Sequence, residues 1–143
     1  MEQSIPLNIE RQVREQYDVF MIQLKRAYEP SNRKDGYRVL IDRLWPRGIK
    51  KQELDLDEWL KDLAPSTKLR KEFGHDPAHW KSFVSAYKKE LQSPKARELI
   101  QRLAQQASGK RTLTLLYSAR DEEHNNAVVL KDILEKESAK SKS

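Results

Sequence analysis

The sequence predicts a single α/β domain in which a small, mostly parallel three-stranded sheet is covered by about five helices. Short apolar runs without alternation occur at 19–24, 38–41 and 112–118, which is typical of strands that are buried on both faces. Helical periodicity fills the chain between the second and third runs. A chain of 143 residues is long enough for one hydrophobic core.

The expected element order is β-β-α-α-α-α-β-α, and capping and breaking signals set the bounds of the helices. Asp55 stands three residues before Glu58, a capping-box spacing, and predicts a helix that ends at Pro65. Ser66 is the expected cap of a second helix that ends at Gly74. The segment between the first two strands reads as a loop, although a parallel pair would need a longer crossover.

Two Pro signals and one Asp mark the starts of the remaining helices. Asp76-Pro77 and Ser93-Pro94 each combine a capping side chain with proline at the first helical position. Gly109 is expected to end the helix that starts at Pro94, and Asp121 is expected to cap the last helix. We expect an N-terminal extension over 1–17, one domain over 18–136 and a flexible tail over 137–143.

Composition excludes several classes of chemistry. The chain contains no cysteine, which removes disulfides, thiolate catalysis, Fe–S clusters and Cys-based zinc sites, and which permits the cytoplasmic location that we expect. No run of about 18 apolar residues and no secretory signal appear, so we expect no association with a membrane. The net charge is +6, and residues 21–51 hold nine Lys/Arg against three Asp/Glu. This local excess favours an anionic partner, or it is a solvated surface.

Basic side chains follow each of the three expected strands. The carboxyl ends of parallel strands lie at one edge of a sheet, where ligands bind in open α/β folds. An arginine stands at every strand end, and its planar guanidinium suits phosphate or carboxylate. The residues that we expect to bind a small anionic ligand at this edge are Arg26, Arg43, Trp45, Arg47, Gly48, Tyr117 and Arg120.

A purely structural interpretation of the same residues stays open. Asp42 could pair with Arg43, Arg47 or Arg120 and tie the strand ends together. Trp45 could fill a hydrophobic gap, and the residues that follow it could form only a turn. Spacing alone does not decide between a site and a scaffold.

Asp42 and His75 are the candidates for acid–base catalysis. His75 follows Gly74 at an expected helix junction, where it could act on a ligand or could bond to a helix C-terminus. His75, Asp76 and His79 resemble a metal-ligand cluster, but Asp76 is better used as a helix cap, so we expect no metal site. The four glycines are isolated, which excludes the Rossmann and P-loop fingerprints, and the sequence leaves any cofactor unknown.

Three stretches carry a family resemblance: "DGYRVLIDRLWPRG", "WLKDLAPSTKLRKEFGHDP" and "TLLYSARDEEHNNAVVL". They closely resemble the YeaO-like family, a branch of the bacterial domain of unknown function 488 group, over about Lys25 to Leu134. The resemblance implies an α/β domain with a small, mostly parallel sheet and no established reaction. It adds Asn125 and Asn126 to the expected ligand-binding residues. A sister branch has a Cys-His-Arg cluster where this chain has "HNNA", so thiol-dependent activity is not implied.

Three functions remain open from the sequence. The first is binding of a small phosphate- or carboxylate-bearing ligand, with or without catalysis. The second is a nucleic-acid-binding module or regulator, although the basic residues lie in loops with interspersed acids and form no helix-turn-helix motif. The third is a protein-interaction adaptor without catalysis. The sequence predicts neither a reaction nor an oligomeric state.

Overall fold

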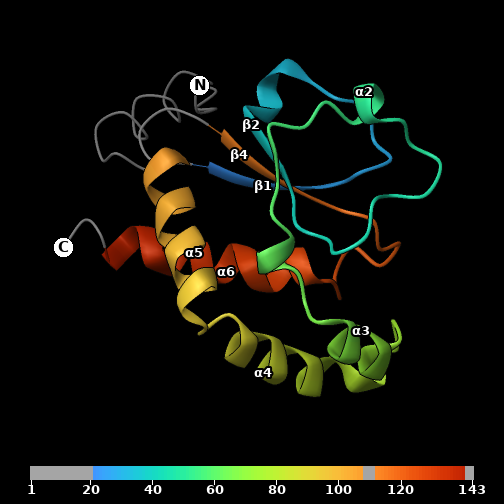
Figure 1. Ribbon diagram of the computed structural model, residues 1–143, viewed down its shortest axis with the longest axis vertical. Helices are drawn as coiled ribbons and strands as arrows, with labels where there is room; N and C mark the ends of the chain where they lie inside the picture. The colour runs from blue at the N-terminus through green and yellow to red at the C-terminus, as the bar shows by residue number, and fades with distance from the viewer. Residues whose placement is uncertain (1–20, 108–111, 141–143) are drawn as a thin grey trace, which may run out of the picture.

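A four-stranded, all-parallel sheet forms the centre of the computed structural model, which describes residues 21–107 and 112–140 (Figure 1). The strands lie in the order β1 (Met21–Arg26), β4 (Thr112–Tyr117), β2 (Tyr37–Leu40) and β3 (Glu58–Trp59). The predicted α/β class is therefore confirmed, and the sheet has one strand more than the three that the sequence predicted.

Strand β4 lies between β1 and β2 and pairs with both. Its pairing with β1 begins at Met21 with Thr112, and its pairing with β2 begins at Tyr37 with Leu113. Strands β1 and β2 are therefore not neighbours, so the short segment between them need not act as a crossover between paired strands. The glycine before β2, Gly36, has a φ of +64°, and a Cβ there would lie 2.2 Å from the carbonyl oxygen of Thr112.

The predicted helix over 55–65 was wrong. Helix α2 (Lys51–Leu54) ends at Asp55, which adopts the left-handed conformation instead of capping a new helix. Strand β3 then pairs with β2, and a short 3-10 helix, η2 (Lys61–Leu63), follows. Long-range contacts explain the difference, because the Glu58 carboxylate binds the Arg102 guanidinium 2.8 Å away. Such contacts override a local capping pattern.

The remaining helices begin near the positions that the sequence predicted. Ser66 accepts a hydrogen bond from Leu69 N–H, and Asp76 accepts one from Ala78 N–H with Pro77 at the first helical position. None of the described helices is both long and apolar enough to cross a membrane. The helices are η1 (Arg33–Asp35), α3 (Thr67–Phe73), η3 (Pro77–His79), α4 (Trp80–Glu90), α5 (Pro94–Ala107) and α6 (Asn126–Lys140).

Helix α6 differs from its prediction at both ends. It begins at Asn126, not directly after Asp121, and it continues to Lys140, so residues 137–140 are helical and not part of a flexible tail. Glu137 forms an ion pair with Arg97 at 2.7 Å, and this contact holds the end of α6 against α5. The predicted extension over 1–17, the stop at Gly109 and residues 141–143 lie outside the described residues.

The two faces of the sheet are covered differently. Helices α3 to α6 contribute to the main apolar core, which also contains Ile22, Val39 and Leu115 from three strands. The opposite face carries a small apolar cluster made of Ala27, Leu40, Leu54 and Leu116. In Figure 1, α3 and α4 lie at the opposite end of the molecule from α2, which belongs to the second face.

Candidate functional site

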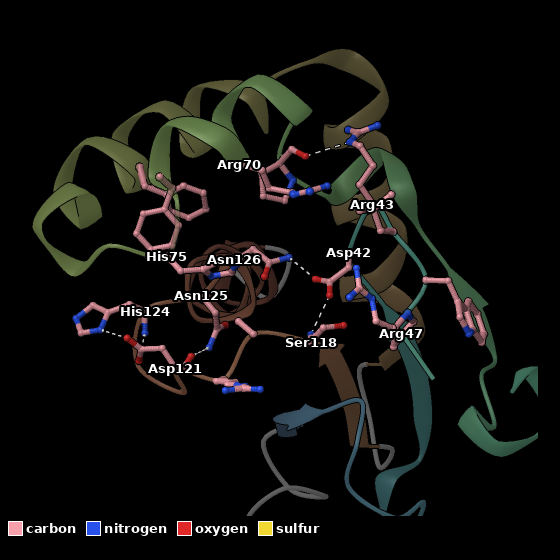
Figure 2. Close-up of a pocket in the computed structure, with 18 of the residues that line it drawn as sticks. Asp42, Arg43, Arg47, Arg70, His75, Ser118, Asp121, His124, Asn125 and Asn126 are labelled. Carbon is pink, nitrogen blue, oxygen red and sulfur yellow. Dashed lines mark hydrogen bonds and ion pairs between the residues drawn. The ribbon is translucent and has the colours of Figure 1, made fainter. Parts of the chain in front are cut away.

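A cleft of about 650 Å³ opens at the carboxyl ends of β2 and β4 (Figure 2). It lies at the edge where open α/β sheets bind ligands, and its volume is in the range of small-molecule sites. The segment after β2, helix α3 and the segment between β4 and α6 supply most of its lining. The predicted site residues that line it are Asp42, Arg43, Trp45, Arg47, His75, Arg120, Asn125 and Asn126.

The other three predicted ligand-binding residues do not line the cleft. Arg26 donates from Nε to the carbonyl oxygen of Ala119 at 2.8 Å and from Nη2 to that of Ser118 at 3.0 Å. Gly48 has a φ of +84° and open space around it, so it serves a turn and not a close approach. Tyr117 is buried in the main core. Of the three, Arg26 supports a wall of the cleft from outside, because Ser118 and Ala119 line it.

Asp42 is held at the cleft by neutral donors. Its Oδ2 accepts from the backbone N–H of Ser118 at 2.8 Å, and its Oδ1 accepts from Nδ2 of Asn126 at 3.1 Å (Figure 2). Its main-chain oxygen accepts from the indole N–H of Trp59 at 2.7 Å. No ion pair joins this carboxylate to an arginine within the described residues. Asp42 therefore does not tie arginines together through ion pairs, as the purely structural interpretation required.

Burial raises the pKa of the Asp42 carboxyl above its ordinary value. Hydrogen bonds from Asn126 and Ser118 and the positive charge of Arg70 oppose this rise without cancelling it. The Ser118 hydroxyl lies near the same carboxylate and helps to lower the pKa of Asp42. Its buried Oγ nevertheless forms no hydrogen bond of good geometry with any described residue. The carboxylate thus stays in a partly desolvated position beside groups that favour its charge.

The four arginines of the cleft have different roles. Arg43 donates from Nε to the carbonyl oxygen of Pro65 at 3.1 Å, so it ties the end of β2 to the segment before α3. Arg47, Arg70 and Arg120 are exposed and form no ion pair with a carboxylate in the part of the chain that the structure describes. Four arginines and two aspartates line the cleft, a formal excess of two positive charges with the histidines neutral.

His75 is placed at the cleft by an unusual backbone. Gly74 and His75 both adopt positive φ, +54° and +56°, at the end of α3. The left-handed region is unfavourable for a residue with a Cβ, although histidine is enriched there. The alternative role at a helix C-terminus belongs to His79, whose Nδ1 lies 3.4 Å from the main-chain oxygen of Phe73. The ring of His75 lines the cleft instead.

The segment before α6 is ordered by its own polar side chains. Asp121 accepts from the backbone N–H groups of Glu123 and His124, and its Oδ2 lies 2.8 Å from Nδ1 of His124. The bond from Glu123 is the largest of the contacts that lower the pKa of Asp121. Asn125 accepts from Val128 N–H and donates to the Asp121 carbonyl, so its carboxamide caps α6.

Sequence reasoning did not assign several residues that line the cleft. Arg70 is the most consequential, because its charge acts on Asp42 and its guanidinium has no ion pair among the described residues. The sequence places Arg70 about one turn before Gly74, at the end of α3. That position does not show that Arg70 faces the cleft until α3 is placed against the sheet. The other unassigned lining residues are Tyr28, Leu44, Pro46, Pro65, Phe73, Phe83, Ser118, Ala119, Asp121 and His124.

The fold and the cleft define a small α/β domain with an arginine-lined cleft at the carboxyl edge of its sheet. The chain belongs to the DUF488-N3i family, described as the inactive DUF488-N3 subclade, whose family model matches residues 21–143. This confirms the family group that the three sequence stretches resemble.

The chain is also similar to curated bacterial proteins. It is 50% identical over 113 residues to the uncharacterized protein YeaO of Escherichia coli (strain K12), a match that covers 79% of this chain and 96% of YeaO. It is 34% identical over 113 residues to uncharacterized proteins of Mycobacterium bovis and Mycobacterium tuberculosis, covering 79% of this chain and 92% of each relative. No solved structure matches the chain.

Proposed function

We propose that this protein binds a small phosphate- or carboxylate-bearing molecule in the arginine-lined cleft. One observation carries the proposal: Arg47, Arg70 and Arg120 come from three separate segments, line one cleft, and form no ion pair with a carboxylate of the described chain. Exposed guanidiniums gathered in a concave site attract anions and bind them through charge-assisted hydrogen bonds.

Binding without catalysis is the better supported form of this function. The family is described as an inactive subclade, which favours a binding role over an enzymatic one. The two side chains considered for acid–base work also differ in their surroundings. Asp42 is already held by two donors, whereas His75 is exposed and has no hydrogen bond within the described residues. None of the contacts in the described part of the chain joins Asp42 and His75 as a catalytic pair.

Calorimetric titration with pyrophosphate and with sugar phosphates tests the proposal. We expect saturable binding that falls about tenfold or more in Arg47→Ala and in Arg70→Ala, because a hydrogen bond to a charged group contributes about 1.5–3 kcal/mol. Arg33→Ala is the matched control, since Arg33 is also exposed but lies in η1 before β2, at the other edge of the sheet. Its affinity should equal that of the unmodified protein.

Equal affinity in Arg47→Ala, Arg70→Ala and the unmodified protein would contradict the proposal. The nucleic-acid alternative gives a different result in the same assay. Titration with mixed-sequence DNA and RNA would then show tight binding that weakens steeply with salt, because phosphate contacts release counterions.

A further inference from the structure

An aspartate, Asp42, is an unexpected lining residue for a cleft that is proposed to bind anions. A negative carboxylate repels a bare phosphate, and the cleft has arginines enough to neutralise it, yet no described arginine forms an ion pair with it. It is oriented instead by Ser118 N–H and Asn126 Nδ2. The carboxylate therefore feels the charge of Arg70 but has no ion pair among the described residues.

The hydrogen-bonding capacity left at this position is that of an acceptor. A carboxylate has about four acceptor positions; the hydrogen bonds of Asp42 use two of them, and the nearby Ser118 hydroxyl can use one more, which leaves at least one for a ligand. Asn126 uses Nδ2 to donate to Ile41 O at 2.8 Å and to Asp42, so its capacity toward the cleft is the acceptor Oδ1. A ligand group that meets Asp42 and Asn126 must therefore donate a hydrogen bond.

We propose, on the basis of the anion-binding function above, that the ligand is a phosphorylated sugar or polyol, and that Asp42 is a specificity-determining residue that accepts from one of its hydroxyls. Arg47, Arg70 and Arg120 hold the phosphate. The cleft of about 650 Å³ has room for both parts. An ammonium group would also satisfy Asp42, but it would have to lie among four arginines, so a neutral hydroxyl is the donor that the charges favour.

A comparison of two ligands on the unmodified protein tests this inference directly. Glucose 6-phosphate carries ring hydroxyls, and cyclohexylmethyl phosphate has a ring of similar size without them. We expect glucose 6-phosphate to bind about tenfold or more tightly, because a hydrogen bond to a charged acceptor is worth about that factor. Equal affinities, or tighter binding of the hydroxyl-free ring, would overturn the inference.

Asp42→Asn supplies a second readout that a merely structural role would not produce. Removal of the negative charge should strengthen binding of inorganic phosphate, and it should reduce the preference for glucose 6-phosphate over cyclohexylmethyl phosphate to about threefold or less. A variant that weakens both ring ligands by the same factor would show that Asp42 only supports the fold. If Asp42→Asn does not fold, the comparison on the unmodified protein decides alone.

The two proposals fail in distinguishable ways. Binding of both phosphates that depends on Arg47 and Arg70 but ignores the hydroxyls would overturn the sugar-phosphate inference and leave anion binding intact. Absence of binding by every phosphate tested would overturn the sugar-phosphate inference and the phosphate form of the proposed function together.

Discussion

Asn126 binds the end of β2 at two points: its Nδ2 donates to the main-chain oxygen of Ile41 at 2.8 Å and to Oδ1 of Asp42 at 3.1 Å. Asn126 is the first residue of α6 and is only 8% exposed. One carboxamide therefore joins the last helix to the second strand and also orients the carboxylate of the cleft. The stability of the fold and the geometry of the candidate site depend on the same side chain.

Asn126→Ala should lower the free energy of unfolding by about 1–3 kcal/mol, because a buried carbonyl oxygen and a partly buried carboxylate each lose a donor. Urea denaturation measures this change. Gln92→Ala is a suitable control, since Gln92 is exposed and its side chain makes no described hydrogen bond, and it should change stability by less than about 0.5 kcal/mol. Similar values for the two variants would show that the Asn126 bonds contribute little.

The buried ion cluster around Asp35 predicts a dependence of stability on pH. The Asp35 side chain is 3% exposed and binds Lys25 Nζ at 3.0 Å and the Arg38 guanidinium. Burial alone would raise the pKa of Asp35, but hydrogen bonds from Lys25, Asn32 N–H and Gln23 hold it below the ordinary value of 3.8. Its stabilising contribution is therefore present above the unfolded pKa and is lost as the pH falls through the lower folded pKa.

Asp35→Asn should cost about 3–5 kcal/mol near neutral pH, because it leaves buried cations without their carboxylate. The difference from the unmodified protein should narrow as the pH falls below about 4, where Asp35 of the unfolded chain begins to bind a proton while the native carboxylate, with its lowered pKa, still resists protonation. Denaturant unfolding over a range of pH measures both. Asp132→Asn, which removes an exposed pair with Lys136, should cost less than about 1 kcal/mol. A pH-independent cost of Asp35→Asn would contradict the assignment.

Two glycines with positive φ allow strain and steric contact to be separated. A Cβ at Gly36 would lie 2.2 Å from the main-chain oxygen of Thr112, whereas a Cβ at Gly48 would meet nothing within 4 Å. Gly48→Ala should therefore cost about 1 kcal/mol from backbone strain alone. Gly36→Ala should cost at least about 3 kcal/mol, because β2 and β4 must also move apart. Thermal denaturation compares them, and equal losses would exclude the steric contribution.

The backbone of His75 predicts an inverted order of stability for two substitutions. Because φ is +56°, His75→Gly should be more stable than His75→Ala by about 1 kcal/mol. At Ser85, an exposed position inside α4, the glycine variant should instead be less stable than the alanine variant by about 1 kcal/mol. Chemical denaturation of the four variants gives both differences. The same order at both positions would show that His75 is not strained in solution.

The sequence predicted the class of fold, three of the strands and the edge that holds the cleft. These follow from local signals: dense apolar runs, capping residues such as Asp76, and arginines that follow the strands. Arg43, Arg47 and Arg120 line one cleft at the edge where the parallel arrangement placed them, and His75 joins them from the end of α3, which the strand pattern did not predict.

The parts that were missed depend on contacts between distant segments. Strand β3 has two residues, too few for periodicity, and Glu58 finds its partner Arg102 far along the chain. Arg70 enters the cleft only because α3 packs against the core through Leu69 and Phe73. The predicted role of Arg26 changed for the same reason, since its guanidinium meets the carbonyls that follow β4. No local sequence pattern predicts where these side chains lie relative to distant segments.

The central place of β4 also sets the order in which this protein can assemble. Strands β1 and β2 are synthesised early, but the neighbour that each requires is Thr112–Tyr117, which leaves the ribosome only after α3, α4 and α5. Until then both strands keep unpaired backbone edges, which are open to association with other chains. The sheet therefore closes late and through contacts between distant parts of the sequence, a topology that favours slow folding. Nascent chains that stop before residue 112 would lack the central strand, and the β2–β3 pairing would be the one strand pairing left among the described residues.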